Sequence, residues 1–347
     1  MQKYMLTLFL VIINAGIVLA QQTDTVRIGN QNTMNAEKLY NQGISYYEQG
    51  NLERSLELFN ASINENPDFY RAYYNRGIVK FETDDYIGAL VDFDKVIAEI
   101  PNFAMAYLAK GILHREQDKP EEAIASFSEA ISAKDNFYMA YYYRGITFFE
   151  TKEYAKAMSD FTRCIEIKPD FAYAYNDRGS SLRKMGELKA ALSDYQQTVF
   201  LDNTMYLTFN NMGSLSIELE QYNEAVEYLT TAIKIQPGYI NALNNRAIAY
   251  THLERFDEAL SDLNEVIEND PENAVALTNR GIVKYRLNDY DGAVADHTLA
   301  IENNPRMGDA FLNRGIAKEM MRDRQGARQD WIRAFELGIK EAKEYLQ

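Results

Sequence analysis

The sequence predicts an all-α fold, an α-solenoid built from tandem antiparallel helix pairs. Three observations predict it: prolines, glycines and alanines each recur at intervals of 34 residues or multiples of 34, and the apolar residues inside each interval follow helical spacing. Length alone would suggest two compact domains for a chain of 347 residues. A fixed period over most of the chain indicates instead a row of stacked repeats, each contacting its neighbours.

The N-terminus is expected to lie outside this fold, with residues 1–20 forming a secretory signal peptide. Lys3 precedes an uncharged apolar run, residues 4–20, which ends in the small residue Ala20 before a polar stretch. The alternative is an uncleaved anchor, because about 17 residues is the shortest length that crosses a bilayer. With cleavage, the protein is expected to be exported to the periplasm or the cell exterior, without stable membrane insertion. Residues 21–35 are polar and aperiodic, and are expected to form a linker.

Nine repeats are expected over residues 36–339, without an insertion or a deletion. Their expected starts are Ala36, Tyr70, Ala104, Tyr138, Ala172, Tyr206, Ile240, Ala274 and Gly308. Counting from each start, apolar or small residues fill positions 3, 4, 8 and 11 and then 20, 24, 27 and 28, which is the spacing of two amphipathic helices. Prolines at position 32 end the pairs, because proline cannot continue a helix.

The glycine at repeat position 8 predicts close packing inside each pair. Eight of the nine repeats carry it, with Ala247 in the remaining one. Glycine inside a helix costs about 0.5–1 kcal/mol relative to alanine. Something must therefore press against the backbone at this position, and the second helix of the same pair is the simplest candidate.

These residues resemble the tetratricopeptide repeat family over nearly all of the chain behind the apolar N-terminus. One repeat carries the family pattern almost throughout, in Tyr141, Gly145, Phe148, Tyr154, Ala157, Phe161 and Pro169, and departs from it only with Cys164. The resemblance implies a right-handed superhelical solenoid whose first helices line a concave groove. Residues 340–347 are expected to form a C-terminal capping helix that covers the last hydrophobic face.

Charged residues at positions 7 and 23 vary together. Position 7 is arginine and position 23 is aspartate in the same six repeats: Arg76 with Asp92, Arg144 with Asp160, Arg178 with Asp194, Arg246 with Asp262, Arg280 with Asp296, and Arg314 with Asp330. This covariation predicts a salt bridge between the two helices of a pair. The arginines are therefore interpreted as structural and not as an anion-binding site.

Position 6 is asparagine in six repeats, and the resemblance places it in the groove. The predicted peptide-binding residues there are Asn41, Asn75, Asn211, Asn245, Asn279 and Asn313. Asparagine is a mediocre helix former, and its amide can both donate to a carbonyl and accept from an N–H group. The hypothesis is that an extended segment lies along repeats 6–9. The alternative is that the amides bond only to the adjacent repeat.

Position 13 gives the N-terminal half of the groove an acidic character. The further predicted binding residues are Glu48, Glu82, Glu116 and Glu150, with aromatic side chains beside them. This combination favours a partner with basic and apolar side chains. The alternative interpretation is a solvated acidic face.

Composition and motifs exclude several other functions. A formal net charge of −15 argues against nucleic acid as a partner, because a duplex-binding surface is normally basic. One cysteine and three histidines, with no catalytic or phosphate-binding motif, leave no basis for an enzyme, a cofactor or a metal site. The expected function is a non-catalytic scaffold of the cell envelope that binds protein or peptide segments. The alternative is an architectural spacer or self-assembling element with no peptide ligand.

Overall fold

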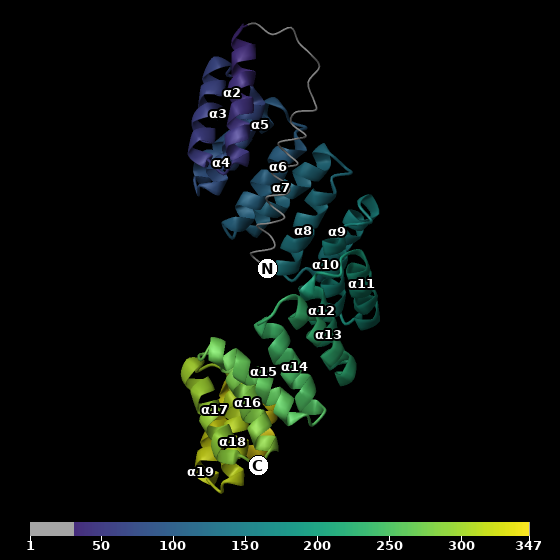
Figure 1. Cartoon of the computed structure of the whole chain (residues 1–347), viewed down its shortest axis with the longest axis vertical. Coiled ribbons are helices and arrows are strands. Elements are labelled where there is room, and N and C mark those ends of the chain that lie inside the picture. Colours follow the sequence, from purple (N-terminus) through teal and green to yellow (C-terminus); the bar gives the residue numbers. More distant parts are fainter. Residues whose placement is uncertain (1–30, 347) are drawn as a thin grey trace. The chain divides into compact units, whose positions relative to one another are not determined.

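The computed structural model describes residues 31–346, and over that range it contains helices and no strand (Figure 1). The expected signal peptide and most of the expected linker lie outside the described residues. The first described helix begins at Gln31, so the last five residues of the expected linker are helical instead. The helices divide into an N-terminal unit that ends at Ser181 and a C-terminal unit that begins at Leu182.

Each repeat contributes a first helix and a second helix. The first helices are α2 (Gln31–Glu48), α4 (Tyr70–Glu82), α6 (Ala104–Glu116), α8 (Tyr138–Glu150), α10 (Ala172–Lys184), α12 (Tyr206–Glu218), α14 (Ile240–His252), α16 (Ala274–Arg286) and α18 (Gly308–Met320). The second helices are α3 (Leu52–Glu65), α5 (Tyr86–Glu99), α7 (Pro120–Ala133), α9 (Tyr154–Ile167), α11 (Leu188–Leu201), α13 (Tyr222–Ile235), α15 (Phe256–Asn269), α17 (Tyr290–Asn303) and α19 (Arg324–Glu336). From repeat 2 onward, every first helix begins at the residue that the sequence predicts.

The glycines at position 8 make the predicted close approach to the second helix. A Cβ atom built on Gly111 would lie 2.5 Å from the ring of Phe127, and one on Gly213 would lie 2.4 Å from Leu229. Both distances are too short for a real contact, so each glycine leaves room for the side chain at position 24 of its own pair. The proposed reason for the glycines is therefore confirmed in both units.

The turn inside each pair uses a left-handed residue at repeat position 15. These residues have φ between 56° and 84°: Gly50, Asp84, Asp118, Lys152, Gly186, Glu220, Glu254, Asn288 and Arg322. Such a residue ends an α-helix and lets the chain reverse. Only two of the nine are glycine, so the sequence alone gave little sign of this turn.

The predicted arginine–aspartate bridges form in five repeats. Both carboxylate oxygens accept hydrogen bonds from one guanidinium in each of these pairs: Arg76–Asp92, Arg144–Asp160, Arg246–Asp262, Arg280–Asp296 and Arg314–Asp330. The same arginine also donates Nη1 to the preceding repeat, as in the 2.7 Å bond from Arg76 to Asn60. The bridge therefore fixes a pair internally and joins it to its neighbour. The sixth predicted pair spans the two units and stays a prediction.

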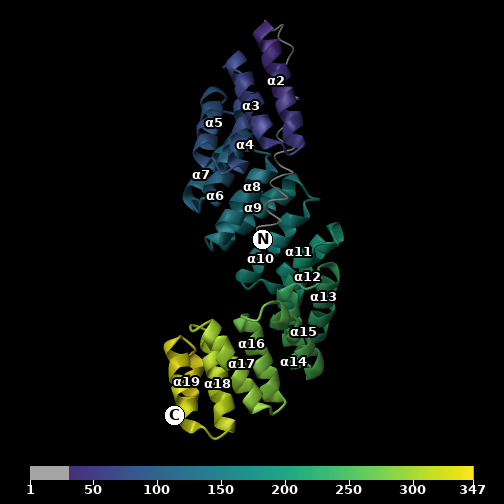
Figure 2. The same ribbon diagram turned by 60° about the vertical axis from the view of Figure 1, so that its left-hand side comes forward.

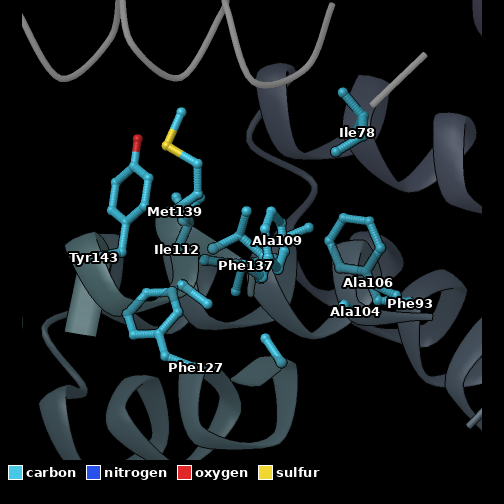
Figure 3. Packing of buried hydrophobic residues seen from close by; sticks show 14 of the residues in the cluster. Ile78, Phe93, Ala104, Ala106, Ala109, Ile112, Phe127, Phe137, Met139 and Tyr143 are labelled. Atoms are coloured by element: carbon cyan, nitrogen blue, oxygen red, sulfur yellow. The ribbon is translucent and has the colours of Figure 1, made fainter. Parts of the chain in front are cut away.

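The hydrophobic core differs between the units. In the N-terminal unit one cluster of buried residues runs continuously from Tyr40 to Ala174, and Figure 3 shows a part of it around Phe127 and Phe137. In the C-terminal unit the buried residues form four smaller clusters. Figure 2 shows helices α16 to α18, which contribute to these clusters, side by side in chain order and followed by α19.

The C-terminal cap is a 3₁₀ helix, η1 (Lys340–Leu346), where the sequence predicted an ordinary helix. Gly338 adopts a left-handed φ of 98° and ends α19 just before it. Ala342 is buried, and the ring of Tyr345 lies 5.1 Å from that of Trp331 on α19. The segment thus covers part of the last repeat in seven residues.

No helix within residues 31–346 is both long enough and apolar enough to span a bilayer.

Candidate peptide-binding face

Adjacent first helices are joined by hydrogen bonds that we call rungs. Each rung connects position 5 or 12 of one repeat with position 6 or 13 of the next, so its two residues are 35 apart in sequence. The rungs are Tyr40–Asn75, Tyr47–Glu82, Arg115–Glu150 and Tyr142–Asp177 in the N-terminal unit, and Arg183–Glu218 and Asn210–Asn245 in the C-terminal unit. Many of the predicted site residues therefore also hold neighbouring repeats together.

The asparagines at position 6 are placed unequally. Asn41 is exposed, and Asn211, Asn279 and Asn313 are half-buried. Asn75 is only 1% exposed. The structure brings Asn75 and Asn245 into rungs, which is the contact to an adjacent repeat that the sequence left open as an alternative.

These amides use their N–H groups internally. Nδ2 of Asn75 donates to the hydroxyl of Tyr40 over 2.9 Å, and Nδ2 of Asn245 donates to Oδ1 of Asn210 over 3.0 Å. Nδ2 of Asn313 donates over 2.9 Å to a carbonyl of its own helix. In none of these three asparagines does Oδ1 have a hydrogen-bond partner within residues 31–346. The first-helix face therefore offers hydrogen-bond acceptors.

Two of the four predicted glutamates, Glu82 and Glu150, accept hydrogen bonds from other side chains. Glu82 accepts a hydrogen bond from Tyr47, and burial raises the pKa of Glu82 above its ordinary value. Glu150 accepts two bonds from the guanidinium of Arg115, at 2.8 and 2.9 Å. The remaining two, Glu48 and Glu116, are exposed.

An aspartate interrupts the asparagine series in repeat 5. The carboxylate of Asp177 accepts hydrogen bonds from the hydroxyl of Tyr142 and from Nδ2 of Asn176, both over 2.9 Å. Burial raises the pKa of Asp177 to about 6. In repeat 4 the same position holds Tyr143, whose ring stacks on Phe127 and whose hydroxyl points away from it (Figure 3). The charged and aromatic residues here separate the two stretches of asparagines.

A cavity of about 510 Å³ lies on this face at the N-terminal end, between α2 and α4. It is lined by Glu37, Tyr40, Asn41, Ile44, Ser45, Glu48 and Arg71. Two of the predicted binding residues, Asn41 and Glu48, thus line one concavity. Glu37, Ile44 and Arg71 were not singled out by sequence reasoning, although all three occupy positions 2 and 9 of the face.

Two residues with reactive side chains, Cys164 and His297, lie in the core. Cys164 is fully buried, and burial raises the pKa of its thiol to about 12. His297 is also fully buried, and burial lowers its pKa to about 4. Across the described part of the chain, no three His, Cys, Asp or Glu side chains gather as a metal-ligand set.

The helix pairs, the position-8 glycines and the rungs define a solenoid of helix–turn–helix repeats. Four family models, each described as tetratricopeptide repeat, match residues 36–69, 104–137, 138–171 and 204–272. The first three ranges begin and end where the 34-residue register places repeats 1, 3 and 4. The chain belongs to the tetratricopeptide repeat family, whose members are protein-interaction scaffolds.

Solved structures share this fold at low sequence identity. A chain of the APC/C hetero-tetramer Cut9-Hcn1 is 13% identical, with a TM-score of 0.58 over 90% of this chain and 75% of that one. PilW, described as a type IV pilus biogenesis factor, is 15% identical, with a TM-score of 0.55 over 61% of this chain and 98% of its own. PilF of Pseudomonas aeruginosa is 18% identical, with a TM-score of 0.53 over 61% and 97%. No curated protein sequence matches the chain.

Proposed function

We propose that the chain is a non-catalytic scaffold of the cell envelope that captures an extended protein segment along its first helices. The observation that carries the proposal is the orientation of the amides of Asn75, Asn245 and Asn313. One N–H of each amide donates inside the protein, and Oδ1 accepts no hydrogen bond within the described residues. An extended peptide presents backbone N–H groups at regular intervals, so acceptors of this kind within either unit suit it whatever its side chains are.

The energetics favour several weak contacts acting together. A single hydrogen bond contributes about 0.5–1.5 kcal/mol net, whereas a buried acceptor left without a partner costs about 1–3 kcal/mol. Oδ1 of Asn75 is buried and without a partner within the described residues. A ligand N–H at such an atom would remove a cost that is present in the free protein.

The envelope location rests on the sequence of residues 1–20. A basic residue, an apolar run and a small residue before a polar stretch are the features of an export signal. Cleavage after Ala20 would release the repeats, and mass spectrometry of the protein from its native host would read the new N-terminus. A mature chain that retains Lys3 would contradict this part of the proposal.

The asparagine ladder can be tested by removing it from the C-terminal unit. We expect the fourfold substitution of Asn211, Asn245, Asn279 and Asn313 by alanine to abolish crosslinked capture of partners from an envelope fraction, with the circular dichroism spectrum unchanged. The matched control replaces three exposed asparagines on second helices by alanine: Asn223, Asn269 and Asn303. Equal capture by the ladder variant and the control would refute the ladder.

One observation favours the alternative function, a self-assembling architectural element. Ile87 and Val91 lie one turn apart on α5 and are 79% and 62% exposed. Exposed apolar side chains of this kind are typical of protein contacts. Concentration-dependent assembly that Ile87→Lys abolishes, and that the ladder substitutions leave unchanged, would favour this alternative over peptide capture.

A further inference from the structure

We propose that the cavity between α2 and α4 is a subsite that selects a basic segment of an extended partner protein. The inference rests on the proposed function, capture along the first helices, and adds the chemistry of the partner at this end of the face. Three features carry it: the shape of the cavity, a buried acceptor beside its floor, and carboxylates without a cation.

The shape of the cavity fits a short extended segment. Glu37, Asn41, Ser45 and Glu48 line it from one face of α2, spaced four, four and three residues apart. Eleven residues of helix advance by about 16 Å. An extended chain rises by about 3.3 Å per residue, so about five residues of a partner cover this length. Tyr40 and Ile44 supply an apolar floor between the polar ends.

The acceptor is Oδ1 of Asn75, and α4 brings it to the cavity. Asn75 follows Arg71, which lines the cavity, by one helical turn on the same face. Its Nδ2 donates to the hydroxyl of Tyr40, another lining residue, over 2.9 Å. Its Oδ1 is buried and accepts no hydrogen bond within residues 31–346. Asn75 does not itself line the cavity, so a backbone N–H of a bound segment would satisfy this atom only after the side chain of Tyr40 moves aside.

The cavity is lined by two carboxylates, Glu37 and Glu48, and one guanidinium, Arg71, so its excess charge is negative and favours a basic ligand. Glu37 and Glu48 are exposed, and neither forms an ion pair within the described residues. Glu48 is the last residue of α2, where the helix dipole is negative and disfavours a carboxylate, and the last turn of α2 contains no basic residue. By contrast, Glu150 ends α8 at the same repeat position and is paired with Arg115. A lysine or arginine of the partner would supply at Glu48 what Arg115 supplies at Glu150.

The test uses the full chain and two fluorescein-labelled ten-residue peptides of Ser, Thr and Val. The lysine peptide carries two lysines four residues apart, about 13 Å along an extended chain and on one side of it. The glutamine peptide has glutamine at both positions. We expect Glu37→Gln with Glu48→Gln to weaken binding of the lysine peptide roughly fivefold, with no change for the glutamine peptide. The matched control is Glu116→Gln, because Glu116 is an exposed glutamate at the same repeat position as Glu48 but outside the cavity.

A second variant separates the acceptor from the charges. Asn75→Ala is expected to weaken both peptides by the same factor, because it removes a contact to the peptide backbone. Thermal unfolding of each variant shows whether the fold is retained.

The outcomes separate a failure of the basic subsite from a failure of the proposed capture of extended segments. If both peptides bind equally to the wild type and the glutamate variant, the basic subsite is wrong and capture of extended segments stands. If neither peptide binds, both the subsite and the proposed capture are wrong. A lysine peptide that binds better, with the preference lost only in the double glutamate variant, supports the subsite.

Discussion

The two units pack the two helices of each repeat together with different side chains at repeat position 24. At position 24, opposite the repeat glycine, the N-terminal unit uses phenylalanine four times: Phe59, Phe93, Phe127 and Phe161. The C-terminal unit uses four residue types at the same position: Tyr195, Leu229, Leu263, His297 and Trp331. One continuous core results in the first unit, and four smaller clusters result in the second. The 34-residue repeat therefore fixes the positions of the helices but not the type of side chain that fills the core between them.

The residues that form the rungs also differ between the two units. In repeats 1 to 4 position 5 is Tyr40, Tyr74, Leu108 and Tyr142, and in repeats 6 to 8 it is Asn210, Asn244 and Thr278. A tyrosine adds buried apolar area to the hydrogen bond, whereas an asparagine adds only the bond. In an array of repeats, stability is close to a sum over repeats and their interfaces. We therefore expect the N-terminal unit to be the more stable one.

The largest expected effect is the loss of a core ring in the N-terminal unit. Phe127→Ala should lower the free energy of unfolding by about 3–5 kcal/mol, because it leaves a cavity beside Gly111 in a closely packed pair. Urea titration followed by circular dichroism measures it. The control is Phe200→Ala on α11, where the ring is 81% exposed and the expected change is within about 0.5 kcal/mol. Similar losses at both sites would mean that the core of this unit is not tightly packed.

The arginine–aspartate bridge should behave alike in both units, because its geometry is the same in both. Arg144→Met leaves the nearly buried carboxylate of Asp160 without its cation and should cost about 3 kcal/mol. Adding Asp160→Leu should recover part of that loss. The equivalent cycle at Arg246 and Asp262 should give the same coupling energy within about 0.5 kcal/mol. Additive effects in either cycle would contradict the pairing.

Of the residues at repeat position 24 in the C-terminal unit, His297 is expected to contribute least to stability. Its side chain is 0% exposed, and neither ring nitrogen has a hydrogen-bond partner within the described chain. His297→Phe copies the N-terminal unit at position 24 and should stabilise the protein by about 1–2 kcal/mol at pH 7. A chemical denaturation series for both proteins measures the difference.

The same variant gives a test by pH. Burial lowers the pKa of His297 from 6.5 to about 4, so between these values the unfolded chain binds a proton that the folded chain does not. Wild-type stability should therefore fall by about 3 kcal/mol more than that of His297→Phe as the pH drops from 6.5 to 4. Parallel pH profiles for the two proteins would show that His297 is not buried in its neutral form.

The smallest expected difference compares the rung between Asn210 and Asn245 with the equivalent positions Asn244 and Asn279, between which no hydrogen bond forms in the described residues. Nδ2 of Asn245 donates to Asn210, whereas Nδ2 of Asn279 is buried without a partner in the described structure. Asn245→Ala should cost about 1 kcal/mol, and Asn279→Ala should cost less than about 0.5 kcal/mol. Thermal unfolding of the two variants under identical conditions resolves this difference. A greater loss at Asn279 would show that its rung forms in solution.

The sequence predicted the features that recur inside most repeats. The start of each first helix from repeat 2 onward, the contact between Gly111 and Phe127, and the bridge between Arg144 and Asp160 all have equivalents at fixed positions in other repeats. Nine internal copies made these positions visible without any related protein. Such features occupy fixed positions in the 34-residue repeat, and those positions are found by aligning the repeats with one another.

The rungs could not be predicted in the same way, because they join different repeats and change their chemistry from one to the next. Tyr40 pairs with an amide, Arg115 with a carboxylate, and Asn210 with a second amide. No residue type repeats, so no covariation is visible. The left-handed turn at position 15 was hidden for a similar reason, because seven of its nine residues are not glycine. The cavity at α2 depends on how side chains such as Arg71 and Glu37 are placed, and spacing alone does not give that.

Hydrogen–deuterium exchange of the full chain, with and without the lysine peptide, tests the central claim most directly. That claim is that protein segments bind to the face of the first helices, with a basic stretch at α2 and α4. The account predicts slower exchange in α2 and α4 on addition of the peptide, and no change in the second helices α3 and α5. Slower exchange confined to α3, α5 or other second helices would contradict it.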